Sequence, residues 1–151
     1  MQINIHVDGI NKLRQKLNLT ADKLQSMRTF WELVGMYIQR QTTRERFGKE
    51  QSPDGTKWKK LASSTIKHRM KRHKNGNMKI LQDTGALRQS IAFEAGDNSV
   101  KVGSKLKYAR THQFGRGNIP ARPFLGVTDS EKKHITDMFR AYIKRHITGG
   151  S

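Results

Sequence analysis

Cysteine is absent from this chain of 151 residues. Without a thiol the protein forms no disulfide, holds no thiolate zinc site and uses no cysteine nucleophile. No apolar run approaches the roughly 20 residues that span a bilayer, and the first residues lack the basic and apolar regions of a signal peptide. We therefore expect a soluble protein of a reducing compartment that is not exported.

Acidic residues are scarce, since 12 Asp and Glu face 30 Lys and Arg and give a formal net charge of +18. A chain of this size repels itself unless so much like charge faces something acidic. Duplex DNA, an anionic membrane surface and an acidic protein are the candidates. Release of counterions gives DNA affinity without sequence specificity, so the charge supports non-specific contact with double-stranded DNA.

Half of the excess charge lies in residues 40–74, where 12 Lys and Arg face 3 acidic residues and leave a net charge of +9. This segment includes a helix predicted over residues 65–73, with Ser63 or Ser64 as its cap. Two interpretations of this helix stay open: its basic side chains form a solvated face, or they contact duplex DNA or an acidic partner. The candidate contact residues are the basic ones that follow Ile66: Lys67, Arg69, Lys71, Arg72 and Lys74.

Hydrophobic residues make up 34% of the chain, which predicts a modest core in a single domain, residues 1–148, with a flexible tail at 149–151. The fold class is α+β, a small and mainly antiparallel sheet packed against two long helices. Residues 40–46 are polar nearly all round, so we expect this end of the long helix to project from the core. Trp58 should fold back over the end of the helix.

The predicted elements follow from apolar periodicity and from turn residues. They are a strand over 3–7, helices over 10–17 and 20–47 with Gly48 ending the latter, a helical turn over 85–88, strands over 90–95 and 99–104 joined by a turn at 96–98, a helix over 108–114, a strand over 124–127, and a last helix capped by Thr128 or Asp129.

The connector from Tyr108 to Gly126 combines aromatic, basic, glycine and proline residues. Pro120 and Pro123 exclude a helix interior or a central strand, so its second half must be a stiff extended loop. Such an apolar loop is either held against its own core or docked on a neighbour. The candidate assembly or core residues are Tyr108, His112, Phe114, Arg122 and Phe124.

Two motifs raise the question of catalysis. The triplet Asp83-Thr84-Gly85 resembles the catalytic loop of retroviral-type aspartic proteases, but that loop needs an almost all-β dimer, and here the pattern continues as a helix. We interpret Asp83 or Thr84 as a helix cap. Histidines 68, 73, 112 and 134 lack both helical i, i+4 spacing and a neighbouring carboxylate cluster. We expect no enzyme, no metal and no cofactor.

A set of short motifs in a fixed order is the most specific signal in the chain. They are Phe47, Ser52-Pro53-Asp54-Gly55, Trp58, Leu61, Thr65, Leu81, Thr84-Gly85, Leu87, Ser90-Ile91, Val102-Gly103-Ser104, Tyr108-Ala109, His112-Gln113-Phe114-Gly115 and Pro120-Ala121-Arg122-Pro123-Phe124-Leu125-Gly126. In this order the set resembles the phage virion morphogenesis family, the tail-completion proteins of Mu-like and related phages. The resemblance covers residues 30–128.

The resemblance implies a structural protein without catalytic residues, which makes the tail competent to join the DNA-filled head. It also implies a homo-oligomeric ring in the virion, other tail or head–tail connector proteins as partners, assembly in the cytoplasm of a bacterial host, and no membrane. We expect residues 40–74 to face DNA or an acidic virion partner, and the loop 108–125 to supply contacts between subunits or with the core. The alternative is a free-standing basic nucleic-acid-binding protein.

Overall fold

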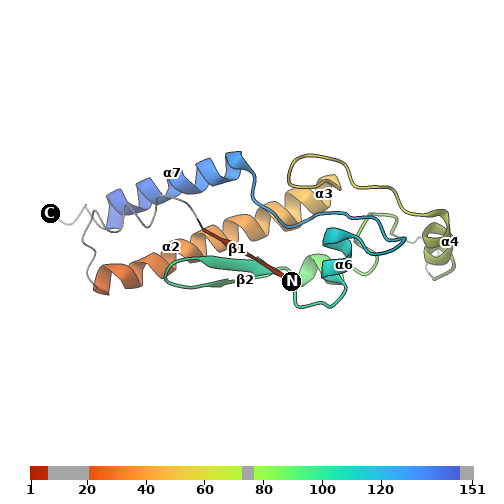
Figure 1. The fold of residues 1–151 in the computed structure, drawn as a ribbon, viewed down its shortest axis with the longest axis horizontal. Helices are drawn as coiled ribbons and strands as arrows, with labels where there is room; N and C mark the ends of the chain where they lie inside the picture. Colours follow the sequence, from red (N-terminus) through yellow and green to blue (C-terminus); the bar gives the residue numbers. More distant parts are fainter. Residues whose placement is uncertain (7–20, 73–76, 147–151) are drawn as a thin grey trace.

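The longest stretch of apolar periodicity forms the central helix of the molecule, with α7 (Asp129–His146) and the sheet alongside it and α4 (Ser63–Arg72) beyond its end (Figure 1). The computed structural model describes residues 1–6, 21–72 and 77–146. The helix predicted over 10–17 and the tail 149–151 lie outside these residues. The elements are β1 (Gln2–Ile5), α2 (Ala21–Arg40), the π-helical segment η1 (Gln41–Arg46), α3 (Phe47–Lys49), α4 (Ser63–Arg72), α5 (Ala86–Gln89), β2 (Ala92–Ala95), β3 (Val100–Gly103), α6 (Ala109–Phe114) and α7 (Asp129–His146).

The described strands form one antiparallel sheet in the order β1-β3-β2. The predicted hairpin of β2 and β3 is confirmed, with the N–H of Gly96 donating to the carbonyl of Ser99 at 2.9 Å. Val100 and Val102 on the middle strand are fully buried. Their burial follows from the alternation of apolar and polar residues, which points one face of the sheet at the core. The predicted α+β class is confirmed.

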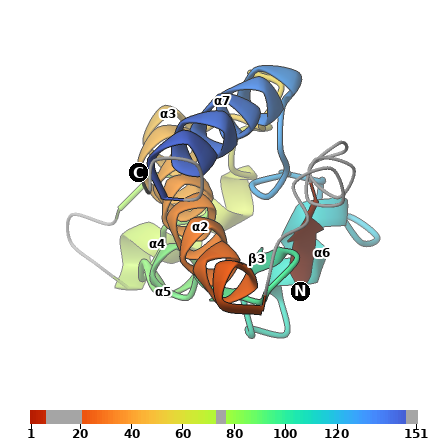
Figure 2. The same ribbon diagram turned by 90° about the vertical axis from the view of Figure 1, so that its left-hand side faces the viewer.

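Helix α2 is covered on two sides, because it packs against the sheet and also against α7. Figure 2 shows α2 between α7 and β3, and Figure 1 shows α7 running back along α2. The ring of Phe30 lies 5.2 Å from that of Phe139 and 5.6 Å from that of Tyr142. The apolar stripe on α2 is therefore almost completely buried; it consists of Met27, Phe30, Trp31, Val34 and Ile38.

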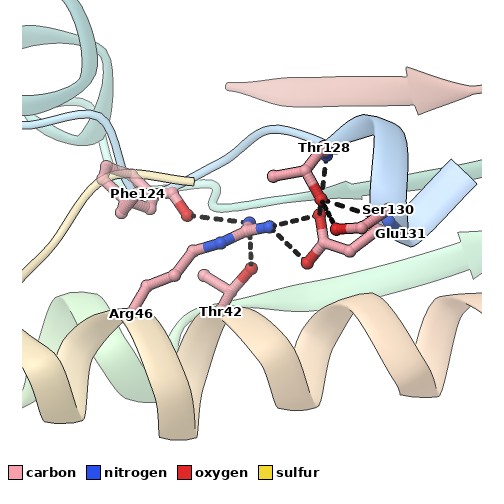
Figure 3. Close-up of polar contacts among 6 residues, drawn as sticks. All are labelled: Thr42, Arg46, Phe124, Thr128, Ser130 and Glu131. Carbon is pink, nitrogen blue, oxygen red and sulfur yellow. Dashed lines mark hydrogen bonds and ion pairs between the residues drawn. The ribbon is translucent and has the colours of Figure 1, made fainter. Parts of the chain in front are cut away.

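One face of the polar end of the long helix is buried, so our expectation that residues 40–46 project from the core is wrong for this face, while Arg40, Arg44 and Glu45 are exposed. In η1, Thr42 is fully buried and Arg46 is 3% exposed. Figure 3 shows how they are accommodated: Arg46 Nη2 donates to both carboxylate oxygens of Glu131 at 2.8 and 2.9 Å. Arg46 Nη1 donates to Thr42 Oγ1 and to the carbonyl of Phe124, both at 3.2 Å. Partners from the last third of the chain thus make the burial of this polar stretch tolerable.

The long helical rod ends at Lys49, one residue after the predicted stop at Gly48. Glu50 then takes a left-handed conformation with φ of 53°. A non-glycine residue in this conformation is strained and persists where neighbouring contacts hold it. Here the carboxylate of Glu50 accepts a hydrogen bond from the backbone N–H of Ile80 at 2.6 Å. This contact holds Glu50 in the conformation that ends the helix, and no local sequence pattern predicts it.

Residues 124–127 form no strand, and this prediction is wrong. Phe124 and Leu125 are buried as a strand would be. Their N–H groups, however, both donate to Oε1 of Gln113 at 3.0 Å, and Gln113 Nε2 donates to the carbonyl of Leu125 at 2.8 Å. One side-chain amide therefore satisfies the buried backbone groups that a neighbouring strand would otherwise have to pair.

Thr128, the residue directly before α7, is its cap, which confirms one of the two predicted caps. Thr128 Oγ1 accepts a hydrogen bond from the N–H of Glu131 at 3.1 Å, and Glu131 Oε2 accepts one from the N–H of Thr128 at 2.7 Å. This reciprocal pair is a capping box. Ile135 and Phe139 then face α2 with almost no exposure. Within the described ranges, no helix is long and apolar enough to cross a membrane.

Candidate functional site

The loop after α6 is held by side chains from the segment that follows the long helix. Arg122 is 7% exposed, and its Nε and Nη2 donate to the carbonyls of Lys59 and Lys60 at 2.8 and 2.9 Å. Trp58 Nε1 donates to the carbonyl of Pro123 at 2.8 Å. These bonds satisfy backbone carbonyls on both segments and join the loop to residues 58–60. The second half of the loop is therefore fixed to its own core.

Phe124 completes this attachment, because it is fully buried with its ring 5.7 Å from that of Phe47. Trp58 meets the same Phe47 edge-on at 5.5 Å. The prediction that Trp58 covers the end of the helix is confirmed. Of the two alternatives left open for the loop, attachment to the core holds for Arg122 and Phe124.

The first half of the loop and the start of α6 instead expose apolar side chains. Phe114 is 65% exposed, and Tyr108 and Ile119 are each 43% exposed. The backbone beneath them is ordered by a tight turn in which Arg116 and Ile119 exchange two hydrogen bonds of 3.0 Å, and Gly115 enters it with φ of 76°. We call Tyr108, Phe114 and Ile119 the apolar tip. Aromatic side chains on a fixed backbone are typical of the centres of protein interfaces.

A pocket of about 430 Å³ opens beside the apolar tip, bounded by residues of α4, α5 and α6 and by the loops between them. His112 stands in its wall with its ring against that of Tyr108 at 5.8 Å. Burial, and then the charge of Arg122, lower the pKa of His112 below its ordinary value. The imidazole is therefore neutral near pH 7, and its buried Nδ1 has no hydrogen-bond partner among the described residues.

The basic helix α4 lies at the opposite end of the molecule from α7 (Figure 1). It begins at Ser63, so both serines proposed as caps lie inside its first turn. Arg69 is buried, and its Nη1 donates to the carbonyls of Asn77 and Lys79 at 2.7 and 2.9 Å. Its burial corrects the expectation that Arg69 meets a partner, because the guanidinium instead holds the following segment against the helix.

Arg72 and Arg69 share one acidic partner, Asp83. Arg72 Nη2 donates to Oδ2 of Asp83, and Arg69 Nε lies 3.5 Å from its Oδ1. Asp83 is therefore not the cap of the helical turn that follows it. Gly85, in a left-handed conformation, occupies the cap position of α5, while Thr84 Oγ1 accepts the N–H of Ala86 at 3.3 Å.

Three members of the predicted contact set are exposed on α4: Lys67, Lys71 and Arg72. The charge of Arg72 is shared with Asp83, whereas Lys67 and Lys71 form no ion pair with a described residue. Lys74 lies outside the described residues. The five predicted residues therefore divide into side chains that hold the fold together and side chains that stay open to solvent, and contact with DNA or an acidic partner stays a prediction for the latter.

The Asp-Thr-Gly triplet has none of the setting of a protease here, since Asp83 faces arginines and the short helix α5 follows it at once. Among the residues with defined positions, no group of three His, Asp or Glu side chains is close enough to hold a metal ion. The exposed apolar and charged side chains of this surface are suited to recognition of a partner.

Sequence reasoning missed the residues that fix the site from within. Gln113 stands inside a short helix and Arg46 inside a polar stretch, so neither stands out by its neighbours. Glu131 was detectable, because a threonine followed three residues later by glutamate is the pattern of a capping box. Its second role, pairing with Arg46, depends on two segments 85 positions apart.

Comparison with known proteins places this geometry in a context. The model of the phage virion morphogenesis family matches residues 8–144. The chain is 38% identical over 117 residues to the Mu-like prophage FluMu G protein 1 of Haemophilus influenzae, covering 76% of this chain and 77% of that protein. It is 29% identical over 108 residues to the putative capsid assembly protein G of Escherichia phage Mu, covering 66% and 69%. No solved structure matches the chain.

Proposed function

Because this chain belongs to the phage virion morphogenesis family, we propose that it completes the phage tail or joins the tail to the head, acting as a ring of identical subunits. Membership makes it a phage structural or assembly protein associated with the virion. The proposal adds the place of action, the ring, assembly in the host cytoplasm, and the absence of a catalytic step.

The observation that carries the ring is the apolar tip. Phe114 is the most exposed large apolar side chain among the described residues, at 65%. It is the last residue of α6, and the backbone on either side of it is held to the core by Gln113 and by Arg122. Burying such a side chain on a neighbour stabilises by about 1.5–3 kcal/mol, and little conformational entropy is lost because the backbone is already fixed. A head-to-tail contact through the apolar tip generates a ring when the rotation between subunits closes.

The positive charge supports a position near the DNA path. Lys67 and Lys71 are exposed on α4 at one end of the elongated molecule, well separated from α7 in Figure 1. Their attraction to DNA needs no base readout, because it comes from counterion release. In a ring, α4 would face either the DNA passing through or an acidic virion protein.

Oligomer size tests the ring directly. We expect light scattering of the purified protein to show assemblies of several subunits as concentration rises, with ring-shaped particles in negative-stain electron microscopy. Phe114→Ala should shift the assemblies toward monomer at an unchanged melting temperature. Met36→Ala is the matched control, because Met36 is an exposed apolar side chain on α2, at 48%, away from the tip. A monomer at every concentration, in both microscopy and scattering, contradicts the ring.

Particle composition tests the virion role. Mass spectrometry of phage particles purified from an induced host should find the protein in the particle fraction. Its absence from particles, together with tight duplex binding by a monomer, would support the free-standing nucleic-acid-binding protein instead.

A further inference from the structure

The pocket beside the apolar tip is lined mainly by apolar side chains contributed by four separate segments. They include Leu61, Leu81, Leu87, Tyr108, Ile119 and Pro120. A volume of about 430 Å³ is in the range of pockets that enclose a small ligand or one to two side chains of a peptide. An apolar hollow of this size on a chain with a modest core is costly to leave in contact with water.

The walls of the pocket are held by bonds already described, so the pocket exists before anything binds. Arg69 fixes the segment after α4, and Arg122 fixes the loop after α6 to the carbonyls of Lys59 and Lys60. A preformed site requires little ordering when a partner arrives, which favours affinity.

The wall of the pocket holds two arginines, Arg69 and Arg122, and one carboxylate, that of Asp83, which pairs with Arg69 and with Arg72. Arg122 is 7% exposed, and no carboxylate of the described residues lies within ion-pair distance of it. Its Nε and Nη2 are bonded to carbonyls, which leaves Nη1 without a hydrogen-bond partner in the described part of the chain. Burial, and then the charge of Arg69, lower the pKa of Arg122. A buried guanidinium without a carboxylate favours an anion from outside.

From these observations we propose that the pocket receives a peptide segment of another virion protein, with an apolar side chain in the hollow and an adjacent aspartate or glutamate carboxylate on Arg122. The proposal rests on the assembly role proposed above, and it names the chemistry of one partner. The carboxylate would accept from Nη1 in a charge-assisted hydrogen bond.

The chemistry of the pocket favours an acidic peptide over the two other occupants. DNA phosphates bind to exposed cations, whereas Arg122 is 7% exposed in a pocket that also holds apolar side chains and the carboxylate of Asp83. A second copy of this chain offers 12 acidic residues against 30 basic ones, so a segment that brings a carboxylate to Arg122 is scarcer there than in an acidic protein. An acidic partner relieves both the apolar exposure and the unpaired charge of Arg122.

Selection from a library of short random peptides on the immobilised full-length protein tests the proposal, with Ile119→Asp as the counter-selection. Ile119 is 43% exposed at the edge of the pocket, so its replacement by aspartate should leave the fold intact while repelling a carboxylate. We expect enriched peptides to share an apolar residue next to aspartate or glutamate. Enrichment of peptides without an acidic residue, or no enrichment over Ile119→Asp, would overturn the proposal.

The best peptide is then titrated against ¹⁵N-labelled protein, at concentrations where the protein is monomeric. Replacing its acidic residue by the matching amide should weaken binding about tenfold or more, as loss of a charge-assisted bond predicts. Lys133→Gln, which removes a charge on α7, should leave the affinity unchanged. Equal affinity of acid and amide peptides overturns the proposal, as does displacement of the peptide by a short DNA duplex or by a second copy of the chain.

The two proposals fail separately. Peptide binding is measured on the monomer, so it does not depend on a ring. A ring that forms while the pocket binds no acidic peptide would overturn only this inference, and a pocket that binds such a peptide in a protein absent from phage particles would overturn only the proposed function.

Discussion

The guanidinium of Arg46 lies 2.8 and 2.9 Å from the two carboxylate oxygens of Glu131, with 85 positions of sequence between the residues (Figure 3). The pair joins the end of the long helical rod to the first turn of α7. Glu131 also accepts the N–H of Thr128, so one carboxylate caps α7 and fixes it against the core. Both side chains are nearly buried, which makes the pair sensitive to the loss of either partner.

Arg46→Ala should lower the free energy of unfolding by about 3–5 kcal/mol, because it leaves the Glu131 carboxylate buried without its cation. Urea denaturation measures the loss. The double replacement Arg46→Met with Glu131→Leu should recover a large part of it, since no unpaired charge remains. Lys49→Ala is the control, because Lys49 pairs with Glu45 on the surface. An equal effect of Arg46→Ala and Lys49→Ala would contradict the assignment.

Gly35→Ala should destabilise the protein, although alanine is the better helix former by about 1 kcal/mol. A Cβ added at Gly35 would stand 2.4 Å from the ring of Phe93, where α2 crosses the sheet. Thermal melts of the single and double variants measure the clash, and Gly35→Ala should cost much less in a Phe93→Ala background. Gly48→Ala is the matched control, because an added Cβ there meets nothing within 4 Å. It should be neutral or stabilising.

Neutral replacements on α4 should separate its two kinds of cation. Lys67→Ala with Lys71→Ala should reduce the salt dependence of duplex binding by about 2 in log K against log salt, at an unchanged melting temperature. Arg69→Ala should lower the melting temperature, because its carbonyl partners at residues 77 and 79 lose their donor. Fluorescence anisotropy and thermal melts provide the two readouts.

The control for charge alone is Lys101→Ala with Lys133→Ala, which removes the same two charges from β3 and α7. If this pair weakens DNA binding as much as the pair on α4, the interaction belongs to net charge and not to the basic helix.

The stability of the protein should fall as pH decreases from 7 to 5, with His112 contributing. Burial, and then the charge of Arg122, lower the pKa of His112 in the folded state, so the unfolded chain takes up the proton first. The stability that neutral His112 contributes is complete above its ordinary value of about 6.5 and is lost as pH falls through the lowered pKa. Denaturation of His112→Gln across this range should show a shallower decline than the wild type, and an unchanged slope would contradict the assignment. His134→Gln, on α7, is the control.

The sequence alone determined the fold class and the order of elements wherever the signal is local. The stripe from Met27 to Ile38 predicts the central helix because side chains three and four positions apart share a face. The hairpin follows from alternation and a turn at Gly96, and the cap of α7 from Thr128. These features depend on residues close together in the chain, so they can be predicted from the sequence. The family can be predicted as well, from the ordered set of motifs.

Contacts between segments distant in sequence fix which polar residues serve the fold and which stay open to solvent. Arg69 and Lys71 stand two positions apart on one basic helix, yet one is buried under carbonyls and the other is exposed. Gln113 forms the backbone hydrogen bonds that a neighbouring strand would otherwise supply to residues 124 and 125. Arg46 is buried by its pairing with Glu131, although the polar sequence around it predicts an exposed helix end. In each case the deciding partner comes from a distant segment, and the free energy of a buried polar group depends on that partner and not on its sequence neighbours.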